Sequence, residues 1–154
     1  RLLGVSSSYS AYKALPFELE TDAVYPRLLK FAIEARENSY SPYSHFKVGA
    51  ALLSASGRIY QGANIENASY PATVCGERVA LFSAIASGER DFVAVAIVGG
   101  SDEVLPECLP CGICRQTYSE FCDGDFDIIT GNESGMKVFK LSELLPHPFD
   151  KASL

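Results

Sequence analysis

Two short cysteine motifs constrain this chain more than any other feature of its sequence. The first is Cys-Gly-Glu-Arg at residues 75–78, and the second is Pro-Cys-Gly-Ile-Cys at residues 110–114. Cys111 and Cys114 are three positions apart, so at the start of a helix their sulfur atoms point the same way. The N-terminus of a helix also favours the thiolate form, because its unpaired N–H groups carry partial positive charge.

A zinc ion needs more than these two sulfur atoms, because it takes four protein ligands, or three and an open position. Cys75 offers the third sulfur and also precedes a helix-like segment. Glu77 then lies beside the metal without having to bind it. Three ligands, an open position and a neighbouring carboxylate predict a metal-activated water with a proton carrier.

Other interpretations of the cysteines stay open at this point. Cys108 is spaced from Cys111 as Cys111 is from Cys114, which echoes part of an iron–sulfur motif, but the fourth cysteine of that motif is missing. We therefore interpret Cys108 as a loop thiol, with replacement of Cys75 as a ligand as the alternative. Buried thiols that bind nothing are also common in protein cores, and we expect Cys122 to be one.

Composition excludes several classes of protein. The chain has 154 residues, 47% of them hydrophobic and 21% charged, which is typical of one globular domain. Its net charge of −6 argues against a nucleic-acid partner. Five cysteines, an odd number, fit a reducing compartment better than a disulfide framework. With no secretory signal pattern and no apolar run of about 18 residues, we expect a cytoplasmic protein without a membrane partner.

The hydrophobic pattern predicts alternating helices and strands. Helices are expected at 22–37, 75–87, 110–121 and 141–145, and strands at 46–53, 58–63, 92–98, 126–130 and 136–139. The strand at 92–98 is apolar throughout, so we expect it to be buried on both faces. This order predicts an α/β fold, a three-layer α/β/α sandwich around five strands. Residues 1–21 lack a clear period, and we expect a flexible N-terminal extension or a vector-derived segment.

Four motifs in order resemble the zinc-dependent cytidine deaminases of the cytidine/deoxycytidylate deaminase superfamily. They are the two cysteine motifs, Pro-Tyr-Ser-His-Phe-Lys-Val-Gly-Ala-Ala-Leu at 42–52 and Asn-Ile-Glu-Asn-Ala-Ser-Tyr at 64–70. The resemblance runs from about Val24 to the C-terminus. It implies one deaminase-like catalytic domain over 22–154 with a mixed sheet, and one Zn²⁺ per subunit on Cys75, Cys111 and Cys114.

The activity that this resemblance implies is hydrolytic deamination of cytidine and 2′-deoxycytidine to uridine and 2′-deoxyuridine, with release of ammonia, in pyrimidine salvage. A blasticidin-S-type aminonucleoside deaminase is the neighbouring alternative. From another class, a non-enzymatic binding module could hold a structural zinc, but such sites are closed by four protein ligands. That alternative needs a fourth ligand, such as Cys108, and leaves Glu77 without a role.

The resemblance also assigns roles to single residues. Glu77 becomes the catalytic group that carries protons between water, the pyrimidine ring and the departing ammonia. Arg78 would hydrogen-bond the thiolates and offset their negative charge, and Gln116 would support the same site. Asn64 and Glu66 resemble the pair that binds the 3′-hydroxyl of the sugar. The substrate-binding residues that it implies are Phe46, Asn64, Glu66, Tyr70, Gly76 and Phe149.

Two of these residues imply an assembly. Tyr70 and Phe149 resemble aromatic residues that reach the active site of a neighbouring subunit, so the resemblance implies a homotetramer with shared sites and a small nucleoside substrate.

Gly76 departs from the family pattern, in which alanine is usual, and we expect it to leave more room near the base. His45 and His147 are expected at the surface and not as ligands.

Overall fold

The computed structural model describes residues 12–14, 21–101, 105–132 and 134–154. The helices are α1 (Thr21–Arg36), α2 (Gly76–Ala86), α3 (Gly112–Phe121) and α4 (Leu141–Leu144), with short 3₁₀ turns at Tyr70–Ala72 and Lys151–Ser153. The strands are β1 (Tyr12–Ala14), β2 (Lys47–Ser54), β3 (Arg58–Ala63), β4 (Phe92–Gly100), β5 (Asp127–Asn132) and β6 (Gly135–Lys140). They form one sheet in the order β1-β3-β2-β4-β5-β6. Strands β4 and β5 are parallel, and the other neighbours are antiparallel.

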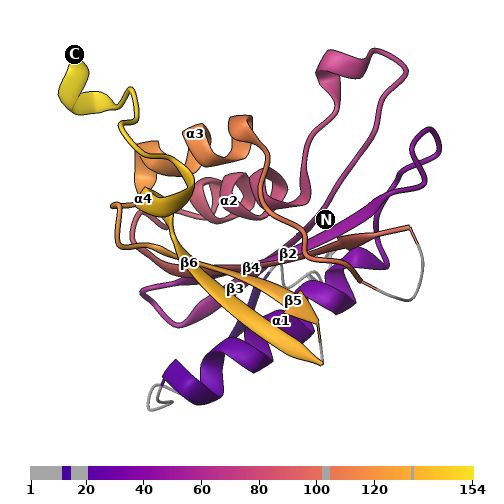
Figure 1. The fold of residues 1–154 in the computed structure, drawn as a ribbon, viewed down its shortest axis with the longest axis horizontal. Coiled ribbons are helices and arrows are strands. Elements are labelled where there is room, and N and C mark those ends of the chain that lie inside the picture. Colours follow the sequence, from indigo (N-terminus) through magenta and orange to yellow (C-terminus); the bar gives the residue numbers. More distant parts are fainter. Residues whose placement is uncertain (1–11, 15–20, 102–104, 133) are drawn as a thin grey trace, which may run out of the picture.

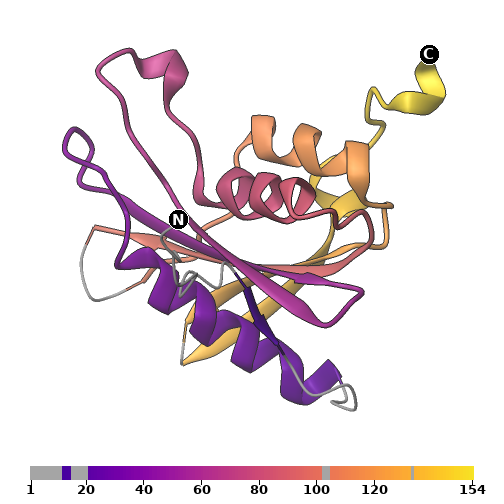
Figure 2. The same ribbon diagram turned by 180° about the vertical axis from the view of Figure 1, so that it is seen from behind.

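The sheet lies between two layers of helices, with α1 on one face and α2 and α3 on the other (Figures 1 and 2). Side chains of β2 serve both layers, because successive residues of a strand point to opposite faces. Ala51 and Leu53 pack with α1, whereas Ala50 and Leu52 pack with α2 and α3. Strand β4 is buried on both faces from Ala94 onward. The predicted three-layer sandwich is confirmed.

The five predicted strands are present, and β1 adds a sixth at the edge of the sheet, paired with β3. Three residues are too few for a hydrophobic period, which is why the sequence pattern did not indicate this strand. Within residues 1–21, the structure describes only 12–14 and 21; the remainder of the predicted extension lies outside the described residues. None of the helices in the described part of the chain is both long and apolar enough to cross a bilayer.

The N-terminal end of α2 lies very close to β3, and this contact places the first cysteine motif on the sheet. A Cβ atom on Gly62 would lie 2.3 Å from the main-chain oxygen of Gly76 and 2.5 Å from the nitrogen of Ala80. Only glycine fits at position 62, because any side chain there would push the helix away. The buried side chains of Leu81 and Ala84 continue the contact along the helix.

Candidate zinc centre and active site

Cys75 and Cys111 occupy the same position at the start of two neighbouring helices. Each is the N-cap residue, Cys75 of α2 (φ −75°, ψ 153°) and Cys111 of α3 (φ −67°, ψ 165°). The third helix therefore begins at Gly112, and Pro110, which we expected at or beside the helix start, precedes the cap. Each sulfur thus lies at the partly positive end of a helix, and neither cysteine side chain caps its own helix by a hydrogen bond, so both are free to bind a metal.

Three sulfur atoms converge at this point. The Sγ atoms of Cys75, Cys111 and Cys114 all lie within 4.8 Å of one another, and those of Cys75 and Cys111 are 3.7 Å apart. Zinc–sulfur bonds of about 2.3 Å in a tetrahedron separate the sulfur atoms by about 3.8 Å, so the spacing fits zinc. Among the residues that the structure describes, no fourth histidine, cysteine or carboxylate joins this group. The three predicted cysteines are thus positioned to hold a zinc ion and leave one coordination position open.

Cys108 belongs to a different cluster. A Cβ atom on Gly99 would lie 2.6 Å from the Cys108 sulfur and 2.9 Å from a ring carbon of Phe46. The thiol therefore packs against β4 beside an aromatic ring, which requires glycine at position 99. Burial raises the pKa of the Cys108 thiol to about 12, and its sulfur is not among the three that converge. The geometry supports Cys75, and not Cys108, as the third sulfur.

Arg78 contacts a predicted ligand directly. Its Nη2 atom lies 3.6 Å from the Cys75 sulfur and donates to the carbonyl oxygen of Thr73 at 3.4 Å. The pKa of Cys75 falls to about 5, chiefly because Cys114 hydrogen-bonds to its sulfur, with smaller contributions from Arg78 and Cys111. The lowered pKa favours the thiolate form of Cys75, and the guanidinium lies where it can offset the charge.

Glu77 lies in the first turn of α2, two residues after Cys75. The residue is 3% exposed, and its Oε2 atom has no hydrogen-bond partner among the described residues. Burial raises the pKa of Glu77 to about 7, and the negative charge of Cys75 adds to the effect. A bound divalent cation would act in the opposite direction and favour the carboxylate. A carboxyl group in this setting can both accept and release a proton near neutral pH.

Asn64 is buried and holds the loop that precedes β2. Its side-chain oxygen accepts hydrogen bonds from the Val48 amide at 2.8 Å and the Ser39 hydroxyl at 2.5 Å. Its amide nitrogen donates to the carbonyl oxygen of Phe46 at 2.8 Å. These bonds fix the main chain of Phe46, a residue that is 37% exposed and whose ring lies beside Gly99.

Glu66 holds the same loop from its other side and lines an open hollow. Its carboxylate accepts hydrogen bonds from the Tyr43 amide at 2.8 Å and from the amide and hydroxyl of Ser44. The hydrogen bond from Ser44 is the main reason that the pKa of Glu66 lies below its usual value. Together with Tyr70 and Thr73, these residues line a cavity of about 420 Å³. The rings of Tyr43 and Tyr70 meet edge to face, with centroids 5.9 Å apart.

The C-terminal segment is tied to α3 by two side chains. Gln116 donates to the carbonyl oxygen of Phe149 at 2.7 Å, and Arg115 donates to those of Pro110 at 2.7 Å and Leu144 at 2.8 Å. The Phe149 residue itself is 65% exposed. The loop that leads into α2 and the C-terminal segment project at opposite ends of the α2–α3 layer in both views (Figures 1 and 2). Within one chain, the predicted aromatic residues 70 and 149 are thus not brought together.

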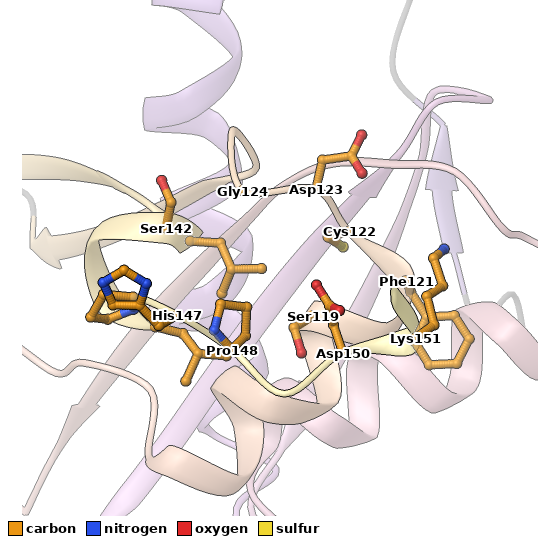
Figure 3. Close-up of a pocket in the computed structure, with 13 residues that line it drawn as sticks. Ser119, Phe121, Cys122, Asp123, Gly124, Ser142, His147, Pro148, Asp150 and Lys151 are labelled. Atoms are coloured by element: carbon orange, nitrogen blue, oxygen red, sulfur yellow. The ribbon is translucent and has the colours of Figure 1, made fainter. Parts of the chain in front are cut away.

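A cavity of about 440 Å³ lies between α3, α4 and the C-terminal segment (Figure 3). Its lining includes Cys122 and Asp123, which follow α3 directly, and His147 and Asp150 from the C-terminal segment. None of the site residues predicted from the sequence lines this cavity, so it is distinct from the cysteine centre. Burial raises the pKa of Cys122 to about 12, which agrees with the packing role expected for it.

Tyr118 contacts the centre although the sequence motifs did not indicate it. Its side chain is buried, and its hydroxyl donates to the main-chain oxygen of Glu77 at 2.9 Å. The tyrosine lies four residues after Cys114, which places both on one face of α3. That spacing is the signal by which it could have been found.

Comparison with known proteins identifies the family. Residues 24–130 match the cytidine and deoxycytidylate deaminase zinc-binding region. The chain belongs to this deaminase family. It is 50% identical over 123 residues to a cytidine deaminase of Halalkalibacterium halodurans, a match that covers 79% of this chain and 91% of that protein. It is 33% identical over 124 residues to a blasticidin-S deaminase of Bacillus cereus, covering 77% and 87% of the two chains.

A solved structure agrees with this deaminase assignment. The crystal structure of a cytidine deaminase from Burkholderia pseudomallei matches with a TM-score of 0.74 and 42% sequence identity. The match covers 85% of this chain and 100% of that one. The family, the fold and the three converging sulfur atoms therefore all indicate a zinc-binding deaminase domain.

Proposed function

We propose that this deaminase hydrolyses cytidine and 2′-deoxycytidine to uridine and 2′-deoxyuridine, with release of ammonia. The observation that carries the proposal is the buried carboxyl group of Glu77, two residues after one of three converging cysteines, whose Oε2 atom has no hydrogen-bond partner among the described residues. A closed structural zinc site has no use for such a group. The relatives named as cytidine deaminases, one of them 50% identical, favour cytidine over blasticidin S as the substrate.

A zinc ion bound to the three cysteines supplies a Lewis acid that lowers the pKa of water. Glu77 takes a proton from the attacking water and delivers it to N3 of the pyrimidine ring, and it later protonates the leaving amine. The C4–O bond forms and the C4–N bond breaks, so that water and cytidine become uridine and ammonia. Burial raises the pKa of Glu77 and a bound cation would lower it, and this balance suits a group that must accept a proton and then release it.

Arg78 supports this chemistry through charge. Three thiolates outweigh the charge of a divalent cation, and the excess would weaken its effect on water. The guanidinium beside the Cys75 sulfur withdraws part of that excess, as do the two helix N-termini. Gln116 supports the centre indirectly, by holding the C-terminal segment against α3.

Nucleoside recognition is assigned to residues of the loop before β2 and of the segment between β3 and the start of α2. We assign Phe46 to the wall beside base and ribose, and Asn64 and Glu66 to the sugar hydroxyl, because a carboxylate and an amide together match a group that donates and accepts. Gly76 reads the base through its main chain. A Cβ atom there would lie 3.2 Å from the oxygen of Gly62, so the methyl group that this chain lacks would face the sheet, which does not support the expectation of more room near the base.

Assembly into a homotetramer with shared sites is part of the proposal. The Tyr70 and Phe149 residues are 71% and 65% exposed, and each would stack on a nucleoside only when a second subunit covers it. We place the enzyme in pyrimidine salvage in the cytoplasm, acting on small nucleosides. Its net charge of −6 speaks against nucleic-acid substrates.

The decisive experiment measures ammonia release from cytidine, 2′-deoxycytidine, cytosine and blasticidin S, with zinc analysis of the same pure protein. We expect one zinc per chain and turnover of the first two substrates. Turnover of blasticidin S without cytidine would establish the neighbouring alternative. Bound zinc without turnover of any of them would establish a structural metal site. Sedimentation of the same sample tests the tetramer.

A further inference from the structure

We propose that Tyr118 is a positioning residue that sets the angle between α2 and α3, and thereby the place of Glu77 relative to the three cysteine sulfurs. The inference rests on the proposed function in one respect, because it takes Glu77 as the proton carrier. It adds a residue that belongs to neither cysteine motif and that would act on the main chain of the catalytic helix.

The contact is buried and specific. The Tyr118 hydroxyl donates to the main-chain oxygen of Glu77 at 2.9 Å, and the two residues are 2% and 3% exposed. The tyrosine ring is held in turn by Phe126, with ring centroids 5.6 Å apart. The carboxyl Oε2 of Glu77 has no partner among the described residues. Tyr118 therefore holds the helix that carries the carboxyl group and leaves the group itself free to react.

The metal ligands explain why such a contact is needed. Cys75 belongs to the start of α2, whereas Cys111 and Cys114 belong to the start of α3. An ion held by all three joins the helices at one point, and two helices joined at one point can still turn about it. Tyr118 is one helical turn beyond Cys114 and provides a second point of attachment.

Apolar packing does not replace this second point. Helix α2 packs mainly on β2 and β3 and touches α3 much less. Contacts between apolar side chains are non-directional, so they resist separation of the helices more than small rotations. A hydrogen bond weakens steeply with distance and angle, and it therefore fixes the rotation. A small change in this rotation would move Glu77 relative to the sulfur atoms of α3, and catalytic rates depend strongly on such placement.

The test is Tyr118→Phe, which removes one oxygen atom and keeps the ring. The Glu77 carbonyl keeps the hydrogen bond from the amide four residues later in the helix, so no buried acceptor is left unpaired. Tyr60→Phe is the matched control. Tyr60 is fully buried in the same core cluster, and its hydroxyl bonds to Glu89 at 3.3 Å, beyond the other end of α2.

We expect Tyr118→Phe to lower kcat and kcat/KM for cytidine together, by about fivefold to tenfold, with KM changed by less than about twofold. Transfer of zinc from the protein to a chromogenic chelator should become several times faster, because the two helices that share the ion are less firmly held. Tyr60→Phe should change each of these by less than about twofold. Thermal unfolding confirms that both variants fold.

Unchanged kcat and unchanged zinc transfer in Tyr118→Phe would overturn the inference. So would equal losses in both variants, in proportion to their loss of stability, because that pattern indicates a purely structural role. Failure of the proposed function is a separate result, namely a wild-type protein that does not turn over cytidine. The zinc-transfer rate tests the link between the helices in that case too, because it needs no substrate.

Discussion

The dipeptide Glu-Arg occurs at both ends of α2, and its two copies have opposite surroundings. At the first end, the buried Glu77 has an oxygen without a partner among the described residues, and Arg78 contacts the Cys75 sulfur. Beyond the other end, Glu89 accepts hydrogen bonds from serine and tyrosine hydroxyls, and Arg90 donates to the carbonyl oxygen of Ile85 in the last turn of α2. Burial raises the pKa of Glu77 to about 7, whereas hydrogen bonds lower that of Glu89.

This difference separates a group kept for chemistry from a group kept for structure. Burying a carboxyl group without a partner costs stability, so it persists in a fold where function requires it. The hydrogen bonds of Glu89 come from Ser54, Ser56 and Tyr60, and they close the β2–β3 hairpin onto the end of the helix. The same residue pair thus stabilises the fold at one end of a helix and is placed for catalysis at the other.

The strongest way to break this comparison is to change both carboxyl groups in the same manner. We expect Glu77→Gln to lower kcat for cytidine by about a thousandfold or more. An amide cannot carry the proton, and general acid–base catalysis typically contributes a rate factor of this order. Zinc content and melting temperature should not fall, since the amide is the same size and carries no charge to bury. The measurements are steady-state kinetics, metal analysis and thermal unfolding.

Glu89→Gln is the matched control for activity, and it should change kcat less than about twofold because it lies at the far end of the helix. If Glu77→Gln retained most of its activity, or if the two variants lost the same fraction, the assignment of Glu77 would be wrong.

The cysteines extend the comparison to the metal. Cys111→Ala should lower zinc affinity by more than about a hundredfold, because it removes one of three ligands. Cys108→Ala should leave one zinc per chain, since this thiol packs beside Phe46 and Gly99 and lies outside the ligand group. Competition with a zinc-binding dye measures both affinities. A Cys108 variant that lost its metal would instead favour a closed, structural site.

The sequence predicts each cysteine motif well because its information is local, whereas the pairing of Cys75 with Cys111, 36 positions apart, was inferred from the number of ligands that zinc needs. Spacing within residues 110–114 and the position of Glu77 after Cys75 are properties of single helix starts, which follow from helix geometry. Three layers likewise follow from the alternation of helices and strands. The exact start of α3 is less predictable, because helix boundaries inferred from sequence are uncertain by one or two residues. The structure makes Cys111 the cap residue, whereas the sequence indicated a start at residue 110.

The remaining contacts depend on residues far apart in the chain. Glu77 and Tyr118 are separated by 41 positions, and Ser54 and Glu89 by 35. No period or motif links such pairs. The sequence alone therefore did not show that Glu77 would be buried while Glu89 would accept hydrogen bonds from distant side chains. The position of Glu77 two residues after a predicted ligand, together with the resemblance to a known family, indicated which carboxyl group is catalytic.

A smaller effect tests the contribution of Glu89 to the stability of the fold. We expect Glu89→Gln to lower the free energy of unfolding by about 1–2 kcal/mol, because charge-assisted hydrogen bonds to two serines are weakened in a partly exposed position. Chemical denaturation of the wild type and the variant measures the difference. Glu77→Gln, at the other end of α2, should show no such loss. A stable Glu89→Gln protein would mean that the hairpin closure contributes little.

The smallest expected effect is the pH dependence of that difference. The pKa of Glu89 lies below its ordinary value of 4.5 in the folded protein, chiefly because Ser54 hydrogen-bonds to it. A group whose pKa is lowered by folding stabilises the protein fully above its unfolded pKa and loses this contribution as pH falls through the folded value. The stability difference between wild type and Glu89→Gln should therefore be constant above about pH 5.5 and shrink as the pH falls below about 4.5. Because both proteins carry the same cysteines, the effect of acid on metal binding cancels in the comparison. A difference that grew on acidification would show that the carboxylate is not stabilised in the folded state.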